Sequence, residues 1–234
     1  ILPSFNIGEI VSTFPLSDNL INRFHEQGFI KVENFINQAQ VAELAYNYDQ
    51  AASGEIHVPA SGSDHVKGQM VQLVNPSQHI TGWQEHAYFL QAWDVAKQLI
   101  GQDAIYVYDQ MIFKPSHHPA EVPWHQDAGY WRKTRGSDNA VTCWQALSPA
   151  WKENGGMQFI VGSHRGEIAE HYSVAHRSEM NGALETKVDP RQAVAISLQP
   201  GDVTFHHCRM LHHTGGNYTD TPRRGLITHF WSSD

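Results

Sequence analysis

Apolar residues in the N-terminal part of the chain recur at the spacing of amphipathic helices. Between the capping residue Ser17 and the stop signal Gly28 they fall on one face, which predicts a helix over 17–27. The same spacing predicts further helices over 37–52 and 84–100. The first two helices present no cluster of titratable groups, so we expect them to support the fold rather than to carry chemistry.

From residue 104 onward the pattern changes to short, alternating apolar segments separated by Gly, Pro and Asn. The expected strands cover residues 29–32, 104–114, 140–147, 157–161, 194–198, 203–206 and 223–231. Several short strands at turn-punctuated intervals, with helices confined to the N-terminal part, are typical of a jelly roll or a related barrel. The sequence therefore predicts a mainly β fold with supporting α-helices.

We expect one domain over residues 1–234, because single all-β domains of this length are ordinary. Helical support would occupy about 1–103 and the jelly-roll core about 104–234. Residues 166–192 have little apolar content and are interpreted as a lid-like insertion over one end of the core. The loop at 53–67, rich in Gly, Ser, Pro and His, is a second candidate cover of a pocket.

Composition narrows the classes of protein to consider. A hydrophobic content of 41%, a charged content of 17% and a net charge of −8 describe a soluble globular protein. No basic run suggests a nucleic-acid partner, and no apolar run approaches the ~20 residues of a membrane span. No signal peptide is visible. Cys143 and Cys208 lack metal-site spacing and are interpreted as buried thiols in a reducing cytosol, so we expect a cytoplasmic protein; the sequence does not indicate its oligomeric state.

Candidate chemistry centres on the segment Trp124-His125-Gln126-Asp127. In an extended segment, His125 and Asp127 would point to the same side and form part of a 2-His-1-carboxylate site for Fe(II). With 16 histidines in the chain, such a triplet is weak evidence by itself. A later stretch offers the missing histidine and a cation.

Residue chemistry alone leaves both of these choices open. The candidates for the third ligand are His206, His207, His212 and His213, and those for the cation are Arg223 and Arg224. The two arginines would face opposite sides of one strand, so at most one of them enters the barrel.

Taken in order, several motifs resemble the phytanoyl-CoA dioxygenase family of Fe(II)/2-oxoglutarate oxygenases. They are His125-Gln126-Asp127, Asn154-Gly155-Gly156, Gly162-Ser163-His164, Gly201-Asp202, His212 and Arg223, and the resemblance spans about residues 108–231. It implies a double-stranded β-helix, the cupin-like variant of the jelly roll. It also implies roles for individual residues. The iron ligands would be His125, Asp127 and His212, and the residues that contact 2-oxoglutarate would be Arg223, Thr214 and Gln110.

The chemistry of an Fe(II) site with a 2-oxo acid requires these residue types independently of the family resemblance. Two neutral imidazoles and a carboxylate suit Fe(II) and leave three positions for a chelating 2-oxo acid and O2. A guanidinium such as that of Arg223 would bind the distal carboxylate in a bidentate manner. We therefore expect a dioxygenase that uses Fe(II), 2-oxoglutarate and O2, hydroxylates a small organic molecule and releases succinate and CO2.

Two alternatives belong to other classes. A cupin-like metal-binding module without turnover would keep the histidines, and a zinc-dependent hydrolase would use the same ligands with an activated water. Both would leave Arg223 without a task. Halogenases of the implied architecture carry a small residue at the carboxylate position, so Asp127 favours hydroxylation. The sequence does not identify the substrate.

Overall fold

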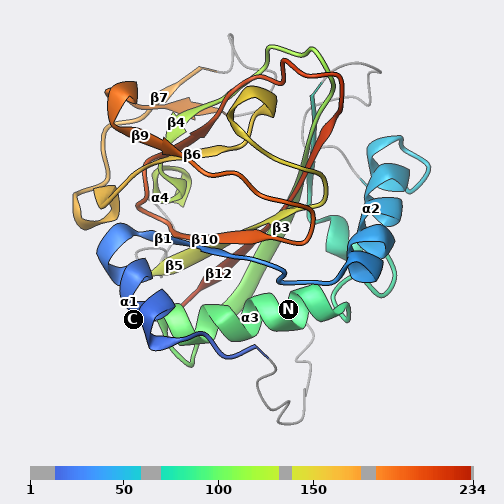
Figure 1. Cartoon of the computed structure of the whole chain (residues 1–234), viewed down its shortest axis with the longest axis horizontal. Helices are drawn as coiled ribbons and strands as arrows, with labels where there is room; N and C mark the ends of the chain where they lie inside the picture. The colour runs from blue at the N-terminus through green and yellow to red at the C-terminus, as the bar shows by residue number, and fades with distance from the viewer. Residues whose placement is uncertain (1–13, 59–69, 132–138, 175–182, 233–234) are drawn as a thin grey trace.

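Two antiparallel sheets facing each other form the body of the protein in the computed structural model, which describes residues 14–58, 70–131, 139–174 and 183–232 (Figure 1). The larger sheet contains, in spatial order, Phe29–Val32 (β1), Val203–His207 (β10), Ala140–Ala146 (β5), Arg223–Trp231 (β12), Ile105–Lys114 (β3) and Val71–Val74 (β2). The smaller contains Val122–His125 (β4), His212–Thr214 (β11), Met157–Ile160 (β6) and Ala193–Ala195 (β9). The expected mainly β architecture is confirmed.

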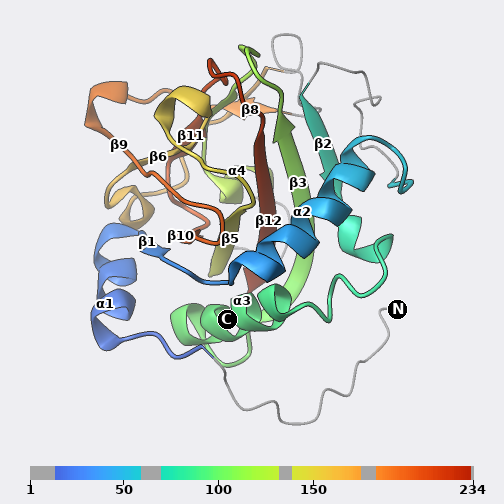
Figure 2. The ribbon, with the colours of Figure 1, turned by 45° about the vertical axis from the view of Figure 1, so that its right-hand side comes forward.

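Three helices cover the outer face of the larger sheet, as the two ribbon views show (Figures 1 and 2). They are Asp18–Gln27 (α1), Gln38–Ala52 (α2) and Ala87–Ile100 (α3), and a short helix, Asp127–Trp131 (α4), follows β4. The predicted ends of α1 are confirmed: the Ser17 side chain accepts from the Leu20 amide, and Gly28 closes the helix at φ 86°. The third helix begins later than predicted, because His86 caps it and the residues before it form turns.

Most predicted strands are confirmed to within a residue or two of their ends. The exception is the segment 194–198, where β9 already ends at Ala195 and Leu198 makes only an isolated bridge with Ala150. The short strands β2 and β11 were not predicted. The short 3-10 helices are Pro76–Gln78, Lys152–Asn154, Ser163–Arg165 and Pro190–Gln192.

Alternation along β12 separates a helix-facing core from an inner cavity. Leu226 and Phe230 belong to the large apolar cluster between the sheet and the helices, whereas Arg223, Ile227 and His229 line a cavity between the two sheets. Because successive side chains of a strand point to opposite faces, one sequence segment contributes to both. The cavity is thus built on the most extensively paired strands of the fold.

The described parts of the predicted insertion lie against β4. Tyr172–Ser173 (β7) and Leu184–Glu185 (β8) form a small hairpin, and the Thr186 amide donates to the Trp124 carbonyl at 2.8 Å. Residues 175–182 of the insertion and 59–67 of the other predicted cover lie outside the described residues. Among the described helices, none is long and apolar enough to cross a membrane.

Candidate active site

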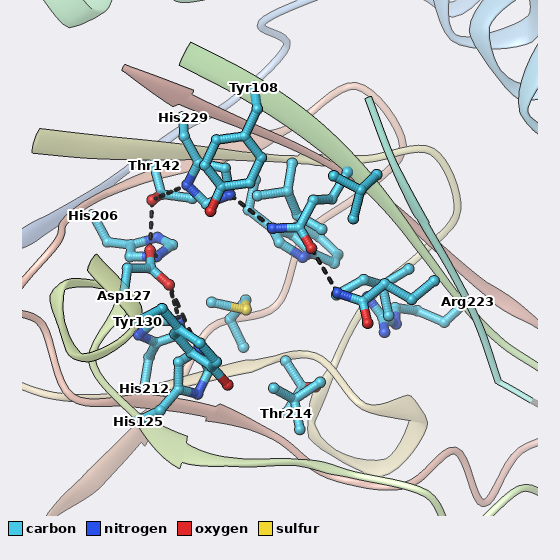
Figure 3. A pocket seen from close by; sticks show the side chains of 18 residues that line it. Tyr108, His125, Asp127, Tyr130, Thr142, His206, His212, Thr214, Arg223 and His229 are labelled. Carbon is cyan, nitrogen blue, oxygen red and sulfur yellow. Dashed lines mark hydrogen bonds and ion pairs between the residues drawn. The ribbon is translucent and has the colours of Figure 1, made fainter. Parts of the chain in front are cut away.

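Three buried side chains converge at one end of the cavity. His125 and His212 each place Nε2 at 3.6 Å from Oδ1 of Asp127, and these three atoms form the group in the described chain with metal-ligand geometry. The two imidazole centroids are 4.1 Å apart. The pairing of β11 with β4 sets this arrangement, because His212 lies directly opposite His125 in the register. Figure 3 shows the three side chains pointing toward one another.

The route by which Asp127 arrives differs from the prediction. Strand β4 ends at His125, and Asp127 is the first residue of α4, so the two side chains do not share a strand face. The expectation of an extended H-x-D segment is wrong, although the two residues do converge. The turn between strand and helix, rather than strand alternation, brings the carboxylate back toward the imidazole.

Both imidazoles of the cluster are held in the tautomer that a metal requires. Nδ1 of His125 bonds to the Pro123 carbonyl at 2.7 Å, and Nδ1 of His212 bonds to the Met210 carbonyl at 2.9 Å. A carbonyl can only accept, so each Nδ1 carries the proton and each Nε2 keeps its lone pair. Such contacts are the usual outer partners of metal-bound histidines.

Electrostatics favour the same protonation states. Burial lowers the pKa of His212 well below its ordinary value, so the ring is neutral. Burial by itself would raise the pKa of Asp127, but its contacts with the surrounding imidazoles outweigh this effect and hold the pKa well below its ordinary value. The cluster therefore presents a neutral His212, an ionised Asp127 and the ring nitrogen of His125, which is a donor set suited to Fe(II).

The three competing histidines lie outside this cluster. His207 bonds to the Arg209 amide, and His213 stacks on Trp124 at a centroid distance of 5.1 Å. His206 is 1% exposed, and neither of its ring nitrogens has a hydrogen-bond partner within the described residues, so the expectation of a hydrogen-bonded core histidine is wrong for it. Its Nε2 lies 3.4 Å from Oδ2 of Asp127. It lines the cavity from β10.

An unpaired cation lies across the cavity from the cluster (Figure 3). Arg223 is 1% exposed, and none of its three guanidinium nitrogens has a hydrogen-bond partner among the described residues. Its guanidinium carbon lies 5.2 Å from the ring of Trp144, and burial lowers its pKa only to about 10, so it stays charged at neutral pH. The hydroxyl of Thr214, which also lines the cavity, is likewise without a partner in the described chain. A buried charge without a counter-ion is costly, so this end fits an anion.

Space for the guanidinium depends on a glycine. A Cβ on Gly225 would lie 2.6 Å from Trp144 Cζ2 and 2.7 Å from Arg223 Nη1. Gly225 occupies an inward position of β12, where the alternation of that strand would place a side chain in the cavity. The neighbouring Arg224 points to the other face and binds Asp49 of α2 through Nε at 2.6 Å.

Gln110, the third residue expected to contact the cosubstrate, lies in the middle of the cavity wall. Its amide bonds to Gln72 at 2.7 Å and to Nε2 of His229 at 3.1 Å. The sequence reasoning did not find Gln72, His229 or Thr142, all of which line the cavity. Their common signal is an inward position on a central or neighbouring strand, which becomes visible only once the strand register is known.

Comparison with known proteins agrees with this geometry. The family model for phytanoyl-CoA dioxygenase (PhyH) matches residues 24–225. The chain belongs to the phytanoyl-CoA dioxygenase family. Within it, the chain is 26% identical over 225 residues to a probable alpha-ketoglutarate-dependent hypophosphite dioxygenase of Stutzerimonas stutzeri, covering 89% of this chain and 76% of that protein. It is 21% identical to the human peroxisomal phytanoyl-CoA dioxygenase, covering 90% and 67%.

Comparison with solved structures extends the similarity to the fold. EvdO2 from Micromonospora carbonacea var. aurantiaca, crystallised with 2-oxoglutarate, matches with a TM-score of 0.78 and 25% identity over 94% of this chain and 92% of that one. The predicted cupin-like jelly roll is confirmed. The chain is an Fe(II)- and 2-oxoglutarate-dependent dioxygenase, which sets aside the metal-binding module and the zinc hydrolase.

The residues present fit both cofactors of this enzyme class. The donor set of the histidine and aspartate cluster suits Fe(II), and the unpaired guanidinium with the unpaired hydroxyl suits the distal carboxylate of a dicarboxylic 2-oxo acid. When bound, Fe(II), 2-oxoglutarate and O2 supply the oxidising power, with succinate and CO2 as the products of the 2-oxo acid. The protein contributes the positioning of these groups in a cavity of about 320 Å³.

Proposed function

We propose that this oxygenase binds iron through His125, Asp127 and His212 and binds the distal carboxylate of 2-oxoglutarate through Arg223 and Thr214. The observation that supports this most directly is the buried guanidinium without a counter-ion, facing a metal-ligand cluster across one cavity. Gln110 is proposed to contribute its remaining amide hydrogen to the same cosubstrate, next to the bond that it makes with His229.

The substrate is a small molecule, and we propose that it is hydroxylated. Relatives in this family are named for hypophosphite, phytanoyl-CoA and ectoine, so the family alone does not select one substrate. The tyrosines Tyr108 and Tyr130 line the cavity beside the cluster and would form the wall nearest to a substrate. Asp127 occupies the carboxylate position, which supports hydroxylation rather than halogenation.

We further propose that residues 1–234 act as one catalytic domain in which the insertion at 166–192 covers the cavity. The hydroxyl of Tyr130, which lines the cavity, accepts from the Leu184 amide of the insertion at 3.0 Å. Both cysteines are free and buried, which is compatible with the proposed cytoplasmic location.

The test is an anaerobic titration of the metal-free protein, first with Fe(II) and then with 2-oxoglutarate, followed by equilibrium dialysis and by visible absorption. Wild-type protein is expected to bind one iron and to bind 2-oxoglutarate tightly only after the metal, while Asp127→Ala binds neither. Wild-type protein that binds iron but ignores 2-oxoglutarate would contradict the assignment of Arg223. A substrate panel scored by succinate release, with mass spectrometry for the gain of one oxygen atom, then tests hydroxylation.

A further inference from the structure

A continuous chain of hydrogen bonds crosses the inner face of the larger sheet and ends on the carboxylate of Asp127. Thr142 Oγ1 lies 2.6 Å from Asp127 Oδ2, and the same oxygen lies 2.9 Å from Nδ1 of His229. His229 Nε2 lies 3.1 Å from Gln110 Nε2, and Gln110 Oε1 lies 2.7 Å from Gln72 Nε2. The dashed lines of Figure 3 follow this chain. Strand pairing builds it, because His229 lies directly opposite Thr142.

The carboxylate at one end of this chain of hydrogen bonds determines the donor and the acceptor in every bond. An ionised carboxylate only accepts, so Thr142 donates its proton to Asp127 and must accept from Nδ1–H of His229. A neutral imidazole with its proton on Nδ1 has a bare Nε2, which therefore accepts from the amide nitrogen of Gln110. The Gln110 carbonyl then accepts from Gln72. All donors thus point toward the carboxylate.

The ring of His229 is held in the orientation that this chain needs. Tyr108 stacks on it at a centroid distance of 4.2 Å and an interplanar angle of 23°, and Trp131 packs edge-on at 5.4 Å. Burial lowers the pKa of His229 to about 4, which agrees with a neutral ring in which Nε2 accepts. His229 is 2% exposed, so water does not compete for either nitrogen.

The two oxygens of Asp127 consequently have different surroundings. Oδ2 accepts from Thr142 and has His206 Nε2 at 3.4 Å, whereas Oδ1 faces Nε2 of both His125 and His212 at 3.6 Å. A carboxylate that bound a metal through both oxygens would have to share the lone pairs of Oδ2 between the metal and the Thr142 hydroxyl. An occupied Oδ2 therefore favours binding through Oδ1 alone, which keeps one more metal position open for ligands.

We propose that Thr142 and His229, backed by Gln110 and Gln72, are positioning residues that restrict Asp127 to metal binding through a single oxygen. This inference rests on the proposed metal site. It gives a role to Thr142, His229 and Gln72, none of which is assigned to the cosubstrate, and it links the amide of Gln72 to Asp127 through the chain of hydrogen bonds. Outer partners of this kind typically change metal affinity by about 10–100-fold.

The first experiment measures Zn(II) and anaerobic Fe(II) affinity of the metal-free protein by calorimetry. Thr142→Val is expected to weaken metal binding about 10–100-fold, and Thr142→Ser, which keeps the hydroxyl, to restore it to within about three-fold of wild type. The matched control is Thr228→Val, because Thr228 is a buried threonine of β12 whose hydroxyl bonds to Tyr88 on the helix side at 2.8 Å. The metal affinity of Thr228→Val is expected to stay within about two-fold of wild type.

His229→Phe is expected to weaken metal binding in the same direction, and the double variant with Thr142→Val to lose little more than the larger single loss, because both changes break one chain. If Thr142→Val binds metal as tightly as Thr228→Val does, the inference is overturned. A different result would contradict the proposed metal site itself, namely that Asp127→Ala binds metal as tightly as wild type does.

The second experiment takes its result from the wild-type protein and uses a variant only to identify signals. Nitrogen-15 NMR of the Zn(II)-loaded wild-type protein reports which imidazole nitrogen carries the proton, with the His229 signals identified by their loss in His229→Gln. A proton on Nδ1 of His229 with a bare Nε2 is the expected result. A proton on Nε2 would reverse the chain and remove the proposed donor to Asp127.

Discussion

At the scale of single residues, neighbours of the same type have opposite tasks in this protein. His212 lies against Asp127 in the metal-ligand cluster, while His213 stacks on Trp124 outside the cluster. Arg223 is buried without a partner in the described chain, while Arg224 binds Asp49. In both pairs the alternation of strand side chains decides which residue reaches the site. Each pair therefore offers a test with a matched control.

The first prediction concerns the metal. His212→Ala removes one ligand and is expected to lower Fe(II) affinity by more than about 100-fold and to abolish turnover, since even outer partners cost 10–100-fold. His213→Ala is expected to leave iron stoichiometry intact, because its ring lies outside the cluster. Metal analysis after dialysis, together with succinate release, measures both. Full iron content in His212→Ala would show that the ligand set is misassigned.

The second prediction concerns the cosubstrate. Losing one partner of a buried charge pair costs about 3–5 kcal/mol, so Arg223→Ala is expected to raise the KM for 2-oxoglutarate by roughly two to four orders of magnitude. Arg224→Ala loses a partly exposed ion pair and is expected to change KM by less than about two-fold. Thr214→Val is expected to cost about 1 kcal/mol, as for a neutral hydrogen bond. Swapped behaviour of the two arginines in a steady-state titration would contradict the register of β12.

At the scale of elements, a buried lysine joins β3 to the end of β11. The Nζ of Lys114 donates to the carbonyl of Thr214 at 3.1 Å and also to that of Gly215. Lys114 lies directly opposite Arg223 in the pairing of β3 with β12. This clamp fixes the strand that presents both a metal ligand and the Thr214 hydroxyl, so its loss should affect stability and cosubstrate binding together.

Lys114→Met, which keeps the apolar stem, is therefore expected to lower the free energy of unfolding by about 1–3 kcal/mol through the two orphaned carbonyls. The KM for 2-oxoglutarate should rise about five-fold, which corresponds to roughly 1 kcal/mol from a displaced Thr214 hydroxyl. The control is Lys152→Met at an exposed position. Urea unfolding and steady-state kinetics measure the two effects. An unchanged KM would limit Lys114 to a structural task.

The insertion is also an element with a testable role. Its described parts are tied to the ligand-bearing segment, since the Gln126 amide donates to His171 at 3.0 Å and the Gln126 side chain bonds to the Ala169 amide at 2.8 Å. We expect proteolytic cleavage within 166–192 to slow when metal, 2-oxoglutarate and substrate fill the cavity, because lids are ordered by what they enclose. Gln126→Ala should speed cleavage in the same range. Cleavage that ignores every ligand would contradict a covering role.

At the scale of the whole molecule, the site is expected to reduce the stability of the protein without its cofactors. A guanidinium that is 1% exposed and unpaired in the described chain is unfavourable until an anion binds. Metal-free Arg223→Met is therefore expected to be more stable than metal-free wild type by about 1–3 kcal/mol. Thermal unfolding measures this difference. Adding 2-oxoglutarate anaerobically to the Fe(II)-loaded proteins should stabilise wild type further but not the variant. An Arg223→Met protein less stable than wild type would mean that the contact with Trp144 dominates.

Much of the architecture could be predicted from local pattern. Helical spacing with a cap at Ser17 and a stop at Gly28 predicted α1, and alternation over 223–231 predicted β12 and that at most one of its two arginines faces inward. The family resemblance, rather than alternation, favoured Arg223. The strands β2 and β11 were not predicted; β11 consists of two histidines and a threonine, so no apolar residue marks it as a strand. The family motif indicated the proposed metal ligands, but the predicted strand face shared by His125 and Asp127 was wrong.

The sequence by itself determined the residue types of the site, the order of its motifs and the face of each long strand. Tertiary structure alone decided which of these residues meet. Strand pairing places His212 opposite His125 and His229 opposite Thr142, although these residues are far apart in the chain. It also leaves His206 and Arg223 buried without hydrogen-bond partners in the described chain. The physical reason is that local propensities fix what each strand presents, whereas register between strands fixes which side chains share the cavity.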